Sequence, residues 1–95
     1  MICTETIKIQ SRDYEYLKVD MYGAPLVMLK GKTGYVMCGY LNIEAAEKLK
    51  DTAVRVTGVK DLESLLKAKV ANLTTGAKAL GIKEGDIVSD IVYKL

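Results

Sequence analysis

An uncharged run of seven residues, 35–41, constrains the fold of this chain more than any other stretch. It follows a turn that is bounded by Gly31 and Gly34. An apolar run of this length next to turn signals indicates a strand buried at the centre of the core. It also contains Cys38, the one thiol that the pattern places inside the fold. The rest of the fold is therefore expected to be arranged around residues 35–41.

Three earlier segments also have the patterns of strands. Residues 3–9 have one apolar side, and residues 26–29 are apolar on both sides, which predicts a strand covered on both faces. Short turns join these segments to residues 14–22 and to the central run. Connections this short permit only antiparallel pairing. We therefore predict an antiparallel meander of about four strands.

Residues 14–22 predict a strand whose two faces differ. Leu17, Val19 and Met21 share one face, which we predict to be buried. The other face carries tyrosines and charged residues: Tyr14, Tyr16, Lys18, Asp20 and Tyr22. This second face is expected to form an interface, because a tyrosine ring covers apolar area while its hydroxyl stays hydrogen-bonded.

The apolar spacing changes to that of helices after residue 41. Asn42 is a good N-cap for a helix that runs to residue 50, with Ile43, Ala46 and Leu49 as its apolar stripe. A short strand is predicted at residues 54–56. Asp61 caps a second helix whose apolar positions are Leu62, Leu65 and Leu66.

The last third of the chain predicts two more helices. One begins at Thr74 or Thr75 and ends at Leu80, where Gly81 followed by Ile82 is typical of a Schellman stop. The other begins near Asp86 and places five apolar residues on one side: Ile87, Val88, Ile91, Val92 and Leu95. Residues 69–73 fit either a strand or a loop.

Strands that come first and helices that come later predict an α+β fold, with three or four helices packed on one face of an antiparallel sheet. A chain of 95 residues supplies one core, so we predict a single domain over residues 1–95. Residues 1–41 are mainly β and residues 42–95 mainly helical. At this size an exposed apolar sheet face favours self-association.

Composition argues against several functional classes. The 14 basic and 12 acidic side chains are interleaved along the chain, whereas surfaces that follow a phosphate backbone concentrate their positive charge. Six tyrosines could stack on bases, so a weak nucleic-acid module is the third hypothesis. Neither a signal peptide nor a membrane span is apparent, which predicts a cytoplasmic protein with no membrane partner. Its two cysteines are then expected to be free thiols.

Two motifs lose their functional interpretation when their context is considered. Gly31-Lys32-Thr33 has the ending of a P-loop, but Leu26 stands where the motif needs glycine, and a strand follows instead of a helix. It is interpreted as a hairpin turn. Asp86 and Asp90 could both reach a hard cation, but solvated helix positions explain them as well. With no histidine and two distant cysteines, neither a metal site nor a cofactor is predicted.

Cys38 is the remaining chemical candidate. A thiol becomes a nucleophile when a neighbouring cation, a helix N-terminus or a base lowers its pKa. Without histidine, the activation would have to come from Arg55, from Lys60 or from the helix that follows Asn42. The alternative is an unreactive core cysteine that behaves as a small apolar residue. Gly39 and Gly58 could let a ligand approach the backbone closely.

Three blocks of the chain form a recognisable set. The specific block is Gly34-Tyr35-Val36-Met37-Cys38-Gly39. The others are Arg55 with Gly58-Val59-Lys60-Asp61-Leu62 and Leu65-Leu66, and Ala77 with Leu80-Gly81-Ile82-Lys83 and Gly85. In this order the blocks resemble the YunC-like family of small bacterial and archaeal proteins of unknown function. The resemblance implies an α+β domain whose N-terminal strands form a tetramerisation region. It implies no established reaction.

The sequence thus predicts a homo-oligomeric, tetrameric domain that binds a small molecule or serves as a scaffold. The alternative is an enzyme that uses Cys38 as a nucleophile or redox thiol on an anionic small substrate. Ligand-binding candidates are Gly39, Arg55, Gly58 and Lys60.

Overall fold

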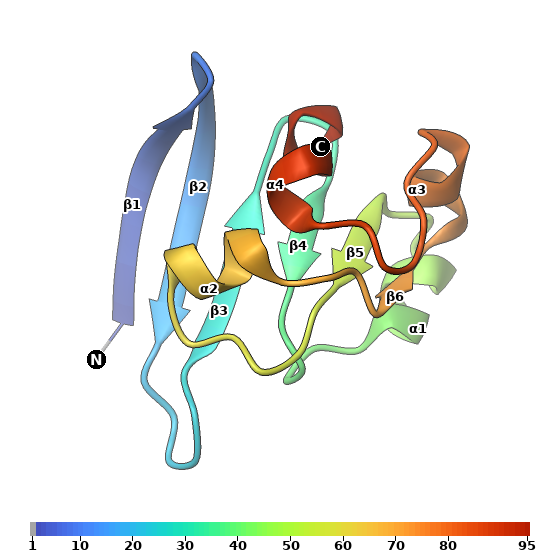
Figure 1. Cartoon of the computed structure of the whole chain (residues 1–95). Coiled ribbons are helices and arrows are strands. Elements are labelled where there is room, and N and C mark those ends of the chain that lie inside the picture. Colours follow the sequence, from blue (N-terminus) through green and yellow to red (C-terminus); the bar gives the residue numbers. More distant parts are fainter. Residues whose placement is uncertain (1) are drawn as a thin grey trace.

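Within residues 2–95, which the computed structural model describes, six strands form one sheet in which every strand lies beside its neighbour in the sequence (Figure 1). The strands are β1 (Ile2–Ile9), β2 (Arg12–Val19), β3 (Leu26–Lys30), β4 (Tyr35–Met37), β5 (Ala53–Arg55) and β6 (Asn72–Leu73). The helices are α1 (Ile43–Lys48), α2 (Leu62–Lys67), α3 (Thr75–Ala79), α4 (Val88–Ile91) and the 3₁₀ helix η1 (Val92–Lys94). The α+β class and the N-terminal position of the first four strands are confirmed, whereas β5 and β6 alternate with the helices. The expected packing of the helices on one face holds for α2 and α4 but not for α1.

The first four strands form the predicted antiparallel meander. α1 then carries the chain across the sheet, so β5 pairs parallel to β4, with Tyr35 opposite Ala53. β6 closes the sheet as an antiparallel partner of β5. Residues 69–73, which fitted two states in the sequence, contain this short strand. The parallel pair β4–β5 matters below because both of its strands end at the same edge.

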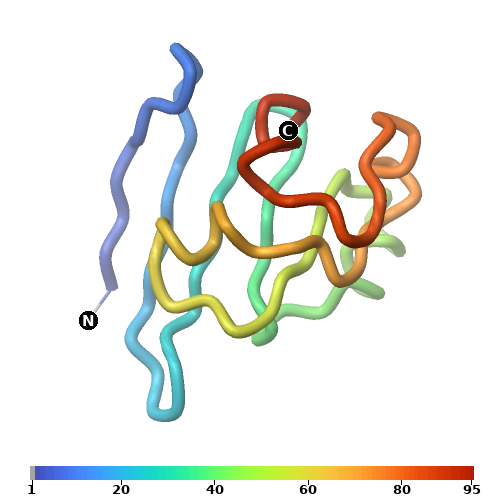
Figure 2. The backbone as a smooth tube through the Cα atoms, in the orientation of Figure 1, coloured from blue at the N-terminus to red at the C-terminus, as the bar shows by residue number. Residues whose placement is uncertain are grey.

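The larger core lies between one face of the sheet and the helices α2 and α4, which Figure 2 shows crossing in front of the strands (Figure 2). Val27, Leu29 and Val36 line this face, and Leu65 of α2 and Val88 of α4 are fully buried against it. Burying a side chain of this size contributes roughly 1.5–3 kcal/mol each. The central position predicted for the apolar run is confirmed for Val36, although β4 ends at Met37 rather than at residue 41.

The predicted orientation of residues 14–22 is wrong. Tyr14 and Tyr16 point into the larger core and are 3% and 6% exposed, whereas Leu17 and Val19 lie half-buried on the opposite face. The physical reason is that a phenol can reach across to the C-terminal helices and still satisfy its hydroxyl. The Tyr14 hydroxyl donates to the carbonyl of Val92 at 3.0 Å.

α1 packs on the face opposite to α2 and α4. Met37, Ala46 and Ala53 form a second, smaller core there. The predicted stripe of α1 fails at Leu49, which is 73% exposed because the helix ends before it. α1 covers only the end of the sheet near β4 and β5. Within residues 2–95, no helix packs over the part of this face that β2 and β3 form, where Leu17 and Met28 are half-buried.

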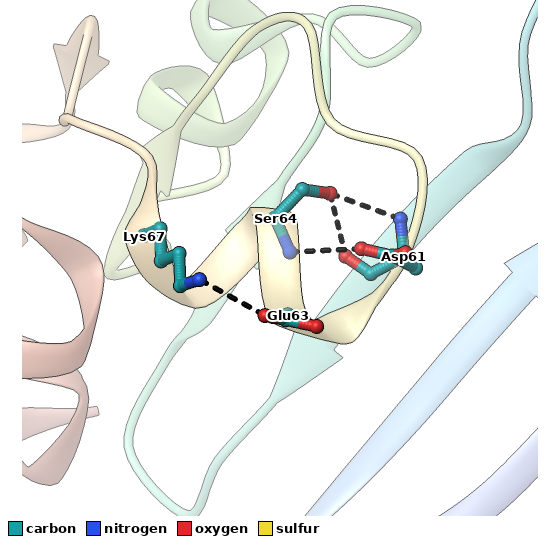
Figure 3. Close-up of polar contacts among 4 residues, drawn as sticks. All are labelled: Asp61, Glu63, Ser64 and Lys67. Carbon is teal, nitrogen blue, oxygen red and sulfur yellow. Dashed lines mark hydrogen bonds and ion pairs between the residues drawn. The ribbon is translucent and has the colours of Figure 1, made fainter.

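The predicted helix N-caps at Asn42, Asp61 and Thr74 are confirmed. The Asn42 side chain accepts from Glu44 N, and the Thr74 side chain accepts from Ala77 N. Asp61 forms a capping box with Ser64, in which each side chain bonds the other residue's backbone (Figure 3). Figure 3 also shows the ion pair between Lys67 and Glu63 one turn apart, at 2.9 Å.

The two C-terminal signals have different outcomes. The Schellman stop is confirmed: Gly81 has φ +87°, Gly81 N donates to Lys78 O, and Ile82 N donates to Ala77 O. The last helix begins at Val88 rather than near Asp86, because the Asp86 carboxylate instead accepts from Lys83 N at 2.8 Å and closes a turn.

The turn that resembled a P-loop is the hairpin turn between β3 and β4, as predicted. Its backbone amides are directed at the chain's own C-terminal segment, since Thr33 N and Gly34 N both donate to the carbonyl oxygen of Leu95 at 2.5 and 2.9 Å. A Cβ on Gly31 would lie 2.5 Å from the carbonyl carbon of Leu95. Glycine is therefore required here by close packing of two backbone segments.

Tyr35 gives a testable pH dependence of stability. Burial, with a hydrogen bond to Asp51 at 2.7 Å, raises its pKa to about 12 from 10.0. A pKa that is raised in the folded state adds stability that is complete below the unfolded pKa and is lost as the pH rises from about 10 to about 12. We expect Tyr35→Phe to cost stability at neutral pH and progressively less above pH 10, as measured by urea unfolding. A cost that stays constant through pH 11 would contradict this.

Candidate functional site

A hollow of about 330 Å³ lies beyond the carboxyl ends of the parallel strands β4 and β5. Ligands of open sheets with parallel strands commonly bind at this edge, because the loops that leave the strands converge there. The hollow is lined by Ala24, Pro25, Cys38, Gly39, Tyr40, Gly58, Val59 and Lys60. Three loops contribute: the connection of β2 to β3, the residues after β4 and the residues after β5.

The structure brings four of the five candidate residues together. Cys38, Gly39, Gly58 and Lys60 all line the hollow, although they come from loops that are about twenty residues apart in the sequence. Arg55 does not line it. It lies next to the hollow, where it holds one of the three loops.

Each of the three side-chain nitrogens of Arg55 donates a hydrogen bond to another residue of the chain. Nη2 donates to the carbonyl of Gly39 at 3.3 Å, Nε donates to the carbonyl of Leu41 at 3.2 Å, and Nη1 donates to Oδ1 of Asn72 at 3.0 Å. A guanidinium suits this task because its donors have a fixed, planar geometry. Arg55 therefore ties the loop after β4 to β6 and positions Gly39.

Cys38 forms part of the inner wall of the hollow and is 2% exposed. Its Sγ accepts a hydrogen bond from the backbone N–H of Val27 at 3.4 Å. β4 ends one residue earlier, so the thiol satisfies a donor of β3 at the point where the ladder between the two strands has stopped. A turn follows directly, in which Leu41 N donates to Cys38 O at 3.1 Å. Cys3, the other thiol, is exposed, and both are free.

The two glycines differ in what the fold requires of them. Gly58 has φ +72°, a conformation that other residues rarely adopt, and an added Cβ would meet no atom within 4 Å. No neighbouring side chain therefore fills the space beside Gly58 on this side of the hollow. At Gly39 an added Cβ would make ordinary contacts, 3.7 Å from Arg55 Nη2 and 3.9 Å from Thr57 Cγ2. Crowding by neighbouring atoms therefore does not require glycine at position 39.

A second, more polar hollow adjoins the first. It is lined by Lys18, Asp20, Met21, Gly23, Ala24, Pro25, Lys60 and Asp61. Three residues, Ala24, Pro25 and Lys60, line both hollows. Hydrogen bonds from Ser64 hold the pKa of the Asp61 carboxyl below its ordinary value, with smaller contributions from Lys60 and Lys18. This second hollow, called the charged hollow below, is thus lined by both basic and acidic side chains.

Sequence reasoning missed the contribution of the connection between β2 and β3. Ala24 and Pro25 line the hollow, and the hydroxyl of Tyr40, 16 residues after Ala24 in the sequence, bonds both the N–H and the carbonyl of Ala24. A glycine–alanine–proline turn carries no signal for such a contact. Metal ligands do not gather at the hollow either: within residues 2–95 no group of three or more metal-ligating side chains was found. None of the helices in this range is long and apolar enough to cross a membrane.

The fold and the hollow define a small α+β domain with a ligand-sized depression at the end of a parallel strand pair. The model of the family described as Domain of unknown function (DUF1805) matches residues 37–95. The uncharacterized protein YunC of Bacillus subtilis is 30% identical over 89 residues, which are 90% of this chain and 88% of that protein. The chain therefore belongs to the DUF1805 family, and the YunC-like resemblance is confirmed.

A solved structure agrees with this fold over the whole chain. The crystal structure of a protein of unknown function from Thermoplasma acidophilum is similar with a TM-score of 0.97 and 43% identity, covering 100% of this chain and 93% of that one. The names of these relatives state no reaction and no ligand, so the function has to be argued from the site.

Proposed function

We propose that this chain is a small-molecule-binding module that works as a homo-oligomer. The observation that carries the binding role is the convergence of Cys38, Gly39, Gly58 and Lys60 on one hollow at the carboxyl ends of β4 and β5. The hollow combines an apolar wall, contributed by Pro25 and Val59 among others, with a single ammonium group on Lys60. Such a mixture suits a small ligand that has both an apolar part and a polar group.

The binding role is tested by screening small fragments against ¹⁵N-labelled protein by NMR. We expect the fragments that bind to shift the amide signals of residues 38–40 and 58–60 together. Substituting Gly39 with leucine, at a position where an added Cβ makes only ordinary contacts, fills the hollow and should abolish these shifts. Hits that cluster elsewhere, or none at millimolar concentration, would reject the hollow as a binding site.

The assembly is proposed to form through the N-terminal strands, as a tetramer. Leu17 and Val19 of β2 lie half-buried on the sheet face that α1 leaves uncovered, and Met28 of β3 lies opposite Leu17 in register. Ile2 at the start of β1 is 70% exposed on the same face. A contiguous apolar surface over three strands favours association with a second copy, because burying it removes apolar area from water.

Substitution of Leu17 with lysine is expected to dissociate this assembly, because burying an unpaired ammonium in the interface is costly. Light scattering coupled to gel filtration measures the result. Leu49→Lys is the matched control, since Leu49 is an exposed leucine directly after α1, which packs at the β4–β5 end of the sheet and not on β2 or β3. A parent protein that is monomeric at micromolar concentration, or a Leu49→Lys variant that dissociates equally, would reject the proposed interface.

Thiol chemistry at Cys38 on an anionic substrate is the second candidate function. It is favoured by the position of Cys38 in the wall of a hollow that also contains the Lys60 side chain. In the structure the sulfur is buried and accepts from Val27 N, so this function requires the hollow to open toward the thiol.

A further inference from the structure

The loop of residues 20–25 lies between two hollows and contributes residues to both. It connects β2 to β3, and the last pair of the ladder below it joins Val19 to Leu26. Ala24 and Pro25 of this loop line the apolar hollow, in which Cys38 is buried, and also the charged hollow beside Lys18 and Asp61. The position of this loop therefore determines whether the two hollows are separate or continuous.

One side chain fastens the end of the loop to the opposite wall. The Tyr40 hydroxyl donates to the carbonyl of Ala24 at 3.0 Å and accepts from the N–H of Ala24 at 3.2 Å. A Cβ on Gly23 would lie 3.8 Å from the same hydroxyl. Both hydrogen bonds are exposed, and Tyr40 is 47% exposed, so water competes with them. Each such bond favours the closed arrangement by roughly 2- to 10-fold over the one in which water replaces it.

We propose that the loop of residues 20–25 is a lid, that Tyr40 is its latch, and that opening the lid joins the two hollows into one channel leading to the Cys38 thiol. The inference rests on the proposed binding function and adds how access to that site is controlled. Lys60 borders both hollows, so it would flank the channel along its length. A ligand would enter past Lys18 and Lys60, and it would reach the buried Cys38 sulfur only while the latch is broken.

The accessibility of the Cys38 thiol reports the opening directly. In a Cys3→Ser background, which removes the exposed thiol, Cys38 is the one cysteine left to react. We expect its labelling by a disulfide reagent such as 5,5′-dithiobis(2-nitrobenzoate) to be slow in the parent protein. Tyr40→Phe removes both latch bonds while keeping the ring, and should raise the labelling rate roughly 10-fold, within about 4- to 100-fold.

Tyr93→Phe is the matched control. Tyr93 is 45% exposed, so the same hydroxyl is removed from a tyrosine of similar exposure, and its ring sits beside Lys94 at the end of the chain, not beside the loop. Its labelling rate should equal that of the parent. Equal rates in Tyr40→Phe and Tyr93→Phe would overturn the proposal.

Urea separates opening of the lid from unfolding of the whole chain. Local opening exposes little surface, so the labelling rate should change little at urea concentrations well below the unfolding midpoint. If the rate instead rises with the full slope of equilibrium unfolding in both variants, no lid exists. The assay needs neither a ligand nor an assembled oligomer. Its failure would therefore leave the proposed binding and assembly untouched. A failed fragment screen with faster labelling of Tyr40→Phe would keep the moving loop and reject its role in ligand access.

Discussion

Replacing Gly34 with alanine is expected to lower the free energy of unfolding by about 3 kcal/mol, because it forces overlap between two backbone segments. An added Cβ would overlap the carbonyl oxygen of Thr52 and lie 2.9 Å from Thr52 Cγ2. That oxygen also accepts the Tyr35 N–H at 3.1 Å. To remove this overlap, Thr52, the residue before β5, has to move away from β4.

Gly23→Ala is the matched control for this substitution. The nearest atom to a Cβ at Gly23 is the Tyr40 hydroxyl, at an ordinary 3.8 Å, and the backbone there is not in the left-handed region. We expect a change within about 0.5 kcal/mol. Urea unfolding of both variants at one protein concentration measures the difference, since stability depends on concentration if the chain assembles. Equal stabilities would show that the β4–β5 contact adjusts freely.

The features that the sequence predicted correctly depend on residues close together in the chain. The N-caps at Asn42, Asp61 and Thr74 and the stop at Gly81 each need one side chain, or one backbone conformation, within a few residues. The short connections of the meander likewise leave a single pairing direction. Physical chemistry acts locally at these positions, so local patterns suffice to predict them.

The features that the sequence did not predict depend on contacts across the fold. Alternation separates the two faces correctly up to Val19, where β2 ends, but which face receives α2 and α4 depends on the reach of Tyr14 to Val92, 78 residues away. The pattern ranks tyrosine as less apolar than leucine, and so it assigned the faces in reverse. Leu49 was assigned to the apolar stripe for a different reason, because α1 ends at Lys48, before the stripe reaches it.

The candidate site falls between these cases. Residue chemistry singled out Cys38, Gly39, Gly58 and Lys60, and the fold places them around one hollow. Arg55 looked like a ligand-binding group because it carries a positive charge. Its donors instead bind Gly39, Leu41 and Asn72. Whether an arginine faces a ligand or a carbonyl depends on where neighbouring strands end, which no local pattern specifies.

Thr74→Val is expected to destabilise the fold by about 3 kcal/mol although it keeps the shape of the side chain. Thr74 is fully buried, and its hydroxyl oxygen accepts from Ala53 N at 3.0 Å and from Ala77 N at 3.4 Å. Valine would leave both N–H groups without this acceptor. A buried unpaired donor costs about 1–3 kcal/mol, and loss of a helix N-cap costs about 1 kcal/mol more.

Thr74→Ser separates the hydroxyl from the methyl group. Serine keeps the acceptor for both donors and removes one buried methyl, which should cost about 1 kcal/mol. We therefore expect urea unfolding to rank the parent above serine and serine above valine. The order would reverse if packing, rather than the hydroxyl, held β5 to α3, because valine preserves the packed volume and serine does not. The serine–valine difference thus identifies the force that joins the start of α3 to β5.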